Sequence, residues 1–249
     1  MLSVTCLAGL FRRAYPAAGN CVGTTNMRHF LTMLFLCVGS GLALGQQAAV
    51  SVQPGWVFDT KSRCKVWSSN ATQGLAMNWT GGCVDGMAEG SGTLQWVDRG
   101  KPSWRYEGDF EKGKMNGRGT FQWPDGQRYV GQFKDDQIAG KGVVSAPNGS
   151  RYEGDWDKGT FNGRGVLVPG DGTRYEGEFK DGRYNGEGVQ TNADGSSFAG
   201  LWTNGLPNGE GTLTTAKGEK YKGAWSNGCF TDGRASAWYL RTAKDCKFQ

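Results

Sequence analysis

Residues 151–173 read RYEGDWDKGTFNGRGVLVPGDGT, and residues 174–189 then begin the same phrase again as RYEGEFKDGRYNGEGV. In the opening letters of the first copy, Tyr152, Gly154 and Trp156 alternate with charged residues. A period of two is expected for a strand that has one buried face and one solvated face. The phrase therefore predicts a half-buried strand, and its return after 23 residues predicts a repeat.

The rest of each unit has the composition of a hairpin. The letters DKGT at residues 157–160 predict a turn, and a second strand is expected over residues 163–168. Asp171-Gly172 then closes the unit, because Asp-Gly tolerates the positive φ angles of tight turns. One unit of 23 residues is therefore expected to form one β-hairpin.

The leading aromatic residue recurs in phase along the chain. A further copy begins 27 residues before the first of the regularly spaced ones, because its connection is longer by four residues. Seven copies, the last incomplete, span residues 79–234. A period of this length without a helical pattern indicates a repeat array. The expected core is this column of rings: Trp79, Tyr106, Tyr129, Tyr152, Tyr175, Phe198 and Tyr221.

Glycine is the other regular feature of the repeat. The chain contains 42 glycines, and most copies carry two that flank a single residue, as Gly163 and Gly165 do. Two alternate positions without side chains leave a slot on one face of a strand, in which an aromatic ring can lie flat. A single hairpin is marginal in water, so stability is expected to come from stacked neighbours.

These residues resemble the MORN repeat. The resemblance rests on Tyr-Glu-Gly-Asp/Glu-Phe/Trp followed by Asn-Gly-x-Gly, in phase over most of residues 79–234. It implies an all-β fold, an elongated single-layer antiparallel sheet of tandem β-hairpins. Residues 46–78 and 235–249 are expected to cap the two ends. The segment from Cys64 to Cys83 resembles the opening of exported bacterial MORN proteins.

The first 45 residues have the pattern of a secretory signal peptide. Arg28 and His29 precede a 15-residue apolar run that ends near Gly45, with small residues before the expected cleavage site. The run is shorter than the roughly 20 residues of a membrane span. Met27 is the start expected for such a leader. An organelle transit peptide is the competing interpretation, because the first 58 residues hold no acid.

Removal of the expected leader, residues 1–45, lowers the net charge of the chain. It takes away three arginines and no acid, so the formal net charge falls from +5 to +2. Binding to nucleic acid therefore loses its electrostatic basis. The chain is expected to be exported, and to be periplasmic or secreted.

Four cysteines remain after the leader: Cys64, Cys83, Cys229 and Cys246. An even number in an exported chain indicates disulfides, and three pairings are open. In a straight array the terminal hairpins have one neighbour each, so they benefit most from a covalent cap. Crossed pairings would require the two ends to meet. We therefore predict Cys64–Cys83 and Cys229–Cys246.

Few residues are candidates for catalysis. The only histidine lies in the leader, and the remaining cysteines lack the short spacing of zinc ligands. Acids recur as pairs two residues apart, such as Glu153 with Asp155, at a separation that suits a glycosidase. A catalytic site occurs once, whereas these pairs recur beside arginines. No enzyme activity, metal or cofactor is expected, and a carboxylate hydrolase is a remote alternative.

Two sets of residues are candidates for a binding surface. Arg105, Arg128, Arg151 and Arg174 precede the leading rings, and their acidic neighbours are expected to pair with them across strands. Trp96 and Trp123 precede a hairpin loop; they either close a widened end of the core or form a binding platform. The function predicted from the sequence is a non-enzymatic scaffold that binds a protein of the cell envelope. A phospholipid-headgroup or cell-wall glycan module is the alternative.

Overall fold

The computed structural model describes residues 53–71 and 75–247. The expected signal peptide and Met27 lie outside the described residues. The elements of the described residues are eighteen β-strands. The predicted fold class is therefore confirmed: an all-β array of tandem hairpins in one elongated sheet.

The strands of the array are long and regular, and those of the two ends are mostly shorter. The array contains β5 (Met87–Asp98), β6 (Lys101–Glu111), β7 (Lys114–Gln122), β8 (Arg128–Lys134), β9 (Gln137–Ser145), β10 (Arg151–Asp157), β11 (Thr160–Val168), β12 (Arg174–Lys180), β13 (Arg183–Thr191), β14 (Ser197–Thr203), β15 (Leu206–Thr214) and β16 (Lys220–Ser226). The ends add β1 (Gln53–Phe58), β2 (Lys65–Ala71), β3 (Leu75–Trp79), β4 (Gly82–Val84), β17 (Cys229–Thr231) and β18 (Ser236–Trp238).

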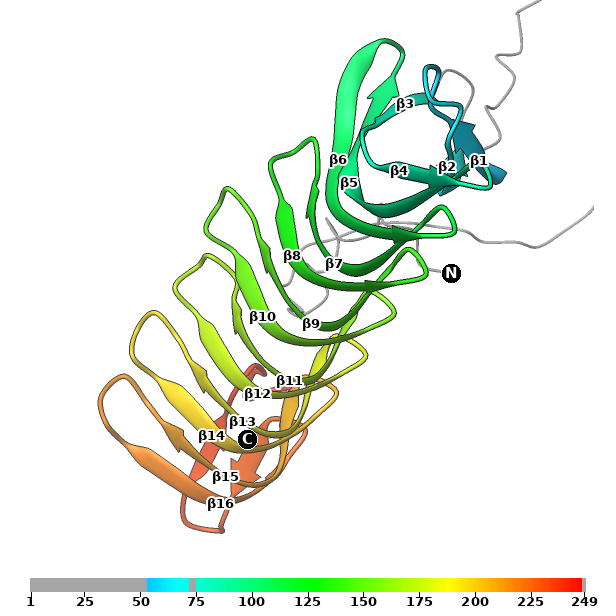
Figure 1. Ribbon diagram of the computed structural model, residues 1–249. Coiled ribbons are helices and arrows are strands. Elements are labelled where there is room, and N and C mark those ends of the chain that lie inside the picture. Colours follow the sequence, from blue (N-terminus) through cyan, green and yellow to red (C-terminus); the bar gives the residue numbers. More distant parts are fainter. Residues whose placement is uncertain (1–52, 72–74, 248–249) are drawn as a thin grey trace, which may run out of the picture.

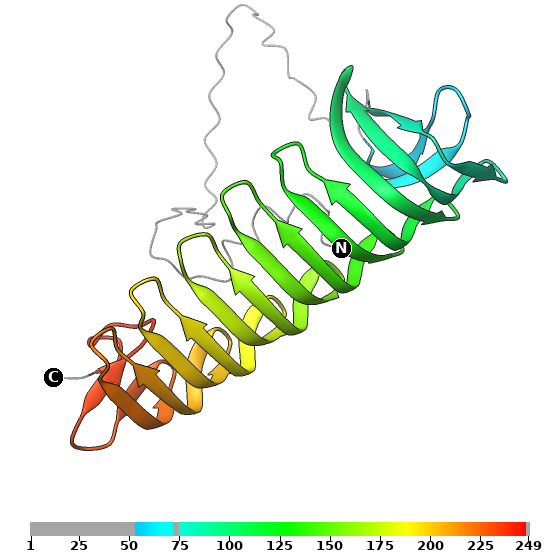
Figure 2. The same ribbon diagram turned by 60° about the vertical axis from the view of Figure 1, so that its left-hand side comes forward.

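Successive strands from β5 to β18 pair antiparallel with their neighbours in the sequence. The hairpins therefore follow one another along a single axis. Each hairpin is bent, which gives the sheet a concave and a convex face (Figure 1). The turned view shows the same straight succession from the N-terminal to the C-terminal end (Figure 2). At the N-terminal end β3 and β4 both pair with β5, and β1 with β2 closes this end.

The short turns of the hairpins have a positive φ at both central residues, as Lys158 (48°) and Gly159 (75°) show. This is the geometry of the type I′ turn, whose twist matches that of the flanking strands. The second position is glycine in the equivalent turns of the array, with Asp136 as the exception at a φ of 65°.

The inner face of the sheet carries the leading rings. A Cβ placed on Gly165 would lie 2.6 Å from a ring carbon of Tyr152, and one on Gly154 would lie 2.6 Å from its hydroxyl oxygen. The ring therefore lies over two paired glycines of its own hairpin. Gly163 does not form this slot, contrary to the prediction. It has a φ of 76° and sits opposite Asp155, where the register of the two strands shifts in a β-bulge.

Rings of successive units contact one another along the inner face. The Tyr152 ring stacks on Phe161 of its own hairpin with centroids 3.7 Å apart and meets Phe179 of the next hairpin edge-on at 5.2 Å. Similar contacts continue through the array and form one core. The structure buries Trp79, Tyr106, Tyr129, Tyr152, Tyr175 and Phe198. Tyr221 is only half-buried, because β17 is short and pairs with β16 only beyond this ring.

Both predicted disulfides are confirmed. Cys64 is bonded to Cys83 with Cα atoms 5.8 Å apart, and Cys229 to Cys246 with Cα atoms 5.5 Å apart. Each bridge lies at one end of the sheet. The bonded cysteines are 19 residues apart in the first bridge and 17 residues apart in the second. Neither links the two ends, as expected for an open array.

Candidate binding surface

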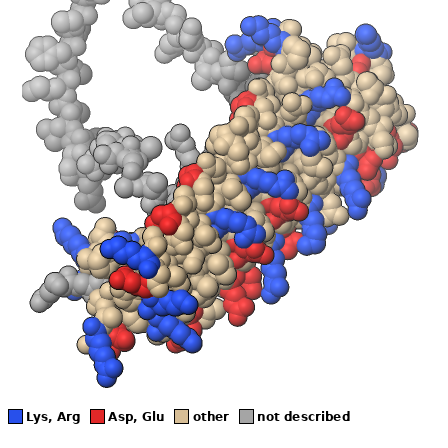
Figure 3. Space-filling model, turned by 90° about the vertical axis from the view of Figure 1, so that its left-hand side faces the viewer, with Lys and Arg blue, Asp and Glu red and all other residues tan. Residues whose placement is uncertain are grey.

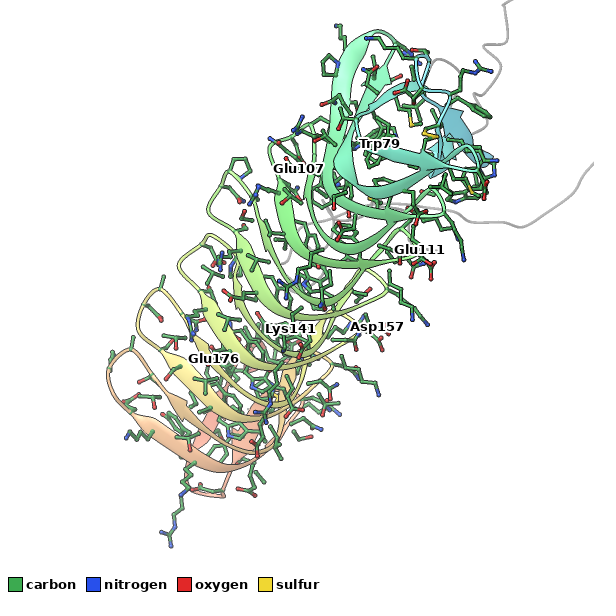
Figure 4. The ribbon with its side chains drawn as sticks, viewed as in Figure 1. Trp79, Glu107, Glu111, Lys141, Asp157 and Glu176 are labelled. Atoms are coloured by element: carbon green, nitrogen blue, oxygen red, sulfur yellow. A yellow bond between two sulfur atoms is a disulfide. The ribbon has the colours of Figure 1, made fainter. Side chains whose placement is uncertain are left out.

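The outer face of the sheet carries the side chains that alternate with the buried rings. On β10, Arg151, Glu153 and Asp155 point away from the core that holds Tyr152 and Trp156. Figure 3 shows lysine and arginine side chains in a row along the molecule, with acidic side chains beside them. Figure 4 shows Glu107 and Glu176 on one side of the array, many residues apart in the chain, and Trp79 enclosed at the N-terminal end. The repeat thus turns one strand's pattern into rows that run across the whole sheet.

The arginines of the candidate surface lie in one of these rows, and three of them form ion pairs. Arg105, Arg151 and Arg174 each contact the glutamate two residues later on the same strand; for Arg174 and Glu176 the distance is 2.6 Å. Arg128 has Val130 at that position and contacts the Thr120 hydroxyl instead, at 3.3 Å. The expectation that these arginines pair across strands was therefore wrong, because the acid on the same strand lies closer.

Cross-strand ion pairs occur in a second row. Lys141 donates a hydrogen bond to Asp155 at 2.7 Å, and Arg164 lies 3.9 Å from Glu178. The hydrogen bond from Lys141 lowers the pKa of the Asp155 carboxyl below its ordinary value. Exposed pairs of this kind contribute about 0–1 kcal/mol each, so their main effect is to neutralise charge locally.

The two tryptophans do not form a binding platform. Trp96 is 6% exposed and Trp123 is 8% exposed. Both pack against Phe121, with ring centroids 5.9 Å and 4.6 Å away. Of the two interpretations, closure of the core near its first end is the one that fits these contacts.

The repeated acid pairs do not have the environment of a catalytic pair. Glu153 contacts Arg151, and Asp155 is bonded to Lys141 with a lowered pKa. A general acid would need a raised pKa, which burial in an apolar pocket supplies. Within residues 53–71 and 75–247 there is no group of three metal-ligating side chains, and no helix suited to crossing a membrane.

A shallow hollow lies on the outer face over β11, β12 and β13. It has a volume of about 460 Å³, and glycines form its floor while acidic, basic and valine side chains form its walls. The lining residues are Arg164, Gly165, Val166, Glu176, Gly177, Glu178, Glu187, Gly188 and Val189. The backbone at these glycines forms the floor of the hollow, because the side chains of the neighbouring positions stand to either side of it.

The outer face carries exposed apolar side chains at the edge of this hollow and on the next strand, β14. Val189 is 44% exposed and Leu201 is 39% exposed. In the sequence this change is visible where FAGLW and YKGAW replace the acidic form of the phrase, but a periodic pattern does not reveal which departures lie side by side. A further exposed pair, Trp56 and Phe58 of β1, lies outside the repeats, so no repeat signal pointed to it.

Comparison with known proteins agrees with the repeat pattern. The family model of the MORN repeat matches six tandem segments, at residues 80–101, 106–128, 129–151, 152–174, 175–197 and 198–220. No curated protein matches the sequence. Among solved structures, the chain is similar to the TCP domain of SAS-4 (dCPAP) from Drosophila melanogaster, solved in complex with a proline-rich motif of Ana2 (dSTIL). The identity is 14%, the match covers 74% of this chain and 99% of that one, and the TM-score is 0.34.

Proposed function

Because this chain belongs to the MORN repeat family, whose repeats bind proteins or lipids and are typically non-catalytic, we propose that it is an exported scaffold that binds a partner protein through its outer face. The observation that carries this proposal is the division of the sheet into two faces. The inner face is filled by rings, whereas the outer face presents exposed side chains from many consecutive hairpins. A rigid surface of this length suits a protein ligand.

The charge pattern favours a protein over an anionic lipid. Three of the four arginines in the row are already paired with glutamates, so little uncompensated positive charge faces outward. Attraction to an anionic membrane surface needs clustered free cations, each worth about 1 kcal/mol. Export is supported by the two disulfides, which persist in oxidising compartments.

The test is retention of partners by the immobilised chain, residues 46–249. We expect a discrete protein of the cell envelope to be retained at a fixed ratio. Reversal of Arg105, Arg128, Arg151 and Arg174 to Glu should weaken that retention. The matched control reverses Lys112, Lys158, Lys217 and Lys244 to Glu, which makes the same change in charge at exposed turn positions outside the strands of the outer face.

Parallel measurements separate the alternatives. Sedimentation with vesicles of phosphatidylglycerol and phosphatidylcholine should leave the chain in the supernatant. Vesicle binding that disappears in the arginine variant would favour the lipid-headgroup module. Loss of protein retention on addition of soluble envelope glycan would favour the glycan module instead.

A further inference from the structure

Cation–acid pairing in the second outer row stops partway along the molecule. In β9 to β12 the row consists of Lys141 with Asp155 and Arg164 with Glu178. In the next hairpins the acid lies on the strand that carries the cation in these earlier pairs, and an apolar residue occupies the position opposite it. Glu187 lies opposite Leu201, and Glu210 lies opposite Ala224.

Glu187 and Glu210 are consequently exposed acids without a local counter-ion. Both are exposed, and within the described part of the chain neither forms an ion pair. Lys222 of β16 lies opposite Thr212, and Arg164, which lines the hollow with Glu187, lies 3.9 Å from Glu178. The negative potential of the two acids therefore extends into solvent above the sheet.

An apolar surface lies between these two acids. Leu201 stands on β14, flanked by β13 and β15, and a Cβ at Gly209 would lie 2.9 Å from its Cδ1. Val189, opposite Ala199, extends the apolar surface toward the hollow over β11 to β13. We call the set Glu187, Val189, Ala199, Leu201 and Glu210 the acidic–apolar patch.

From this arrangement we propose that the acidic–apolar patch binds an extended basic segment of the partner protein, in which one apolar side chain lies between two cations. The proposal rests on the proposed function and specifies its ligand. Strands lie about 4.8 Å apart, so β13 and β15 are separated by about 10 Å. In an extended chain alternate side chains share one face and lie about 6.6 Å apart, so cations four residues apart are separated by about 13 Å at the backbone, and their long side chains can reach inward to the two acids. The expected segment is basic–x–apolar–x–basic, in which the central apolar residue covers Leu201.

The hollow also indicates the course of the segment. It adjoins the patch and is lined by Glu176, Glu178 and Glu187, with Arg164 at its far side. A basic chain leaving the patch along the array axis meets acids first and a cation last. The segment is therefore expected to run across the strands and to end near Arg164.

The experiment selects ligands from a displayed library of random dodecapeptides, with residues 46–249 as bait and counter-selection against Glu187→Lys with Glu210→Lys. Enriched peptides should carry two cations four residues apart with an apolar residue midway between them. Absence of enrichment, or enrichment of acidic or uncharged peptides, would overturn the proposal.

Binding of the best enriched peptide then tests the site. The double variant should bind it about tenfold more weakly or worse, and a peptide with both cations changed to Glu should regain binding to that variant. The matched control is Glu111→Lys with Asp157→Lys, which makes the same change in charge at exposed acids outside the patch and should keep affinity within about threefold. Leu201→Asn should weaken binding without altering the salt dependence. Equal loss in both double variants would show a non-specific charge effect and refute the site.

The outcome also separates this proposal from the broader one. Retention of an envelope protein that is unchanged by Glu187→Lys with Glu210→Lys would leave the scaffold function intact and remove the patch as its site.

Discussion

At the scale of single residues, the leading tyrosine combines packing with one hydrogen bond. Its ring covers two glycines, and its hydroxyl donates to the carbonyl oxygen three residues later; for Tyr152 and Asp155 the distance is 2.8 Å. Tyr106, Tyr129 and Tyr175 do the same. Burial raises the pKa of these hydroxyls, so they remain donors at neutral pH. The bond spans the β-bulge and gives the Asp155 carbonyl oxygen a hydrogen-bond donor at the point where the register shifts.

Substitution of Tyr152 separates the two contributions. Tyr152→Ala removes a fully buried ring and should lower the free energy of unfolding by about 3–5 kcal/mol. Tyr152→Phe loses only the bond to Asp155 and should cost about 0.5–1.5 kcal/mol. Gly165→Ala should also destabilise, because its Cβ would overlap the ring. Urea unfolding followed by tryptophan fluorescence measures all three; unchanged midpoints would contradict ring-over-glycine packing.

Asp136 is a second informative residue, because it occupies a turn position that is otherwise glycine. Its Oδ1 accepts a hydrogen bond from the Met115 amide at 2.8 Å, and its Oδ2 is buried without a hydrogen-bond partner among the described residues. Burial raises the pKa of this carboxyl to about 7. The folded protein therefore keeps a proton that the unfolded chain has already lost between about pH 4 and 7.

The sign of this linkage predicts a pH dependence of stability. The contribution of Asp136 to the free energy of unfolding should fall as pH rises through that window, and the full penalty should remain above pH 7. Asp136→Asn keeps an acceptor for Met115 and tolerates the positive φ. It should be more stable than the wild type by about 1–3 kcal/mol at pH 8, and the difference should be much smaller near pH 4.5.

The check is a pair of urea titrations at these two pH values. Asp181→Asn, in the corresponding turn of a later hairpin, is the control and should show no such difference between pH 4.5 and pH 8. A gain for Asp136→Asn that is the same at both pH values would refute the protonation argument.

At the scale of elements, the end strands have fewer neighbours than the inner ones. β17 and β18 contain three residues each, and β18 pairs with β17 alone among the described strands. The bridge between Cys229 and Cys246 holds this end, and Cys64–Cys83 holds the other. In a one-dimensional array each unit contacts only adjacent units, so local loosening does not propagate far.

Removal of one disulfide should therefore act locally. Cys229→Ser with Cys246→Ser should cost about 3 kcal/mol in the chain-entropy treatment of a loop of this size. Hydrogen exchange should accelerate in β16 to β18 and stay unchanged in β9 to β12. Cys64→Ser with Cys83→Ser is the reciprocal control and should loosen β1 to β4 instead. Uniform acceleration across the array would contradict independent end caps.

At the scale of the whole molecule, the elongated sheet offers one long surface and two covalently capped ends (Figure 2). Such a molecule is expected to work outside the cytosol, where its bridges persist. We predict a mature protein that begins near Gln46, after removal of the leader. Mass spectrometry of the protein isolated from an envelope or secreted fraction measures this start. A chain that retains Met1 or Met27 and is found in a cytosolic fraction would contradict export.

Much of the architecture follows from local pattern in the sequence. Strand alternation, Lys-Gly and Asp-Gly turns and the 23-residue period act within one hairpin, so they predicted the hairpins, the column of rings and the open array. The disulfide pairing followed from the same one-dimensional geometry. Each of these features depends on residues that are close in sequence or on exact repetition.

The remaining features depend on neighbours that only the folded sheet brings together. Gly163 proved to belong to a bulge and Arg151 to contact the glutamate on its own strand, because register and rotamer decide those contacts. Trp96 and Trp123 became core residues because Phe121 lies between them. Leu201 lies opposite Glu187 on β13, and its strand also pairs with β15, which carries Glu210. The sequence by itself thus determined the repeating hairpin, since its signals are local, whereas the tertiary structure decided the composition of the outer surface, since rows across the strands join residues that the chain keeps apart.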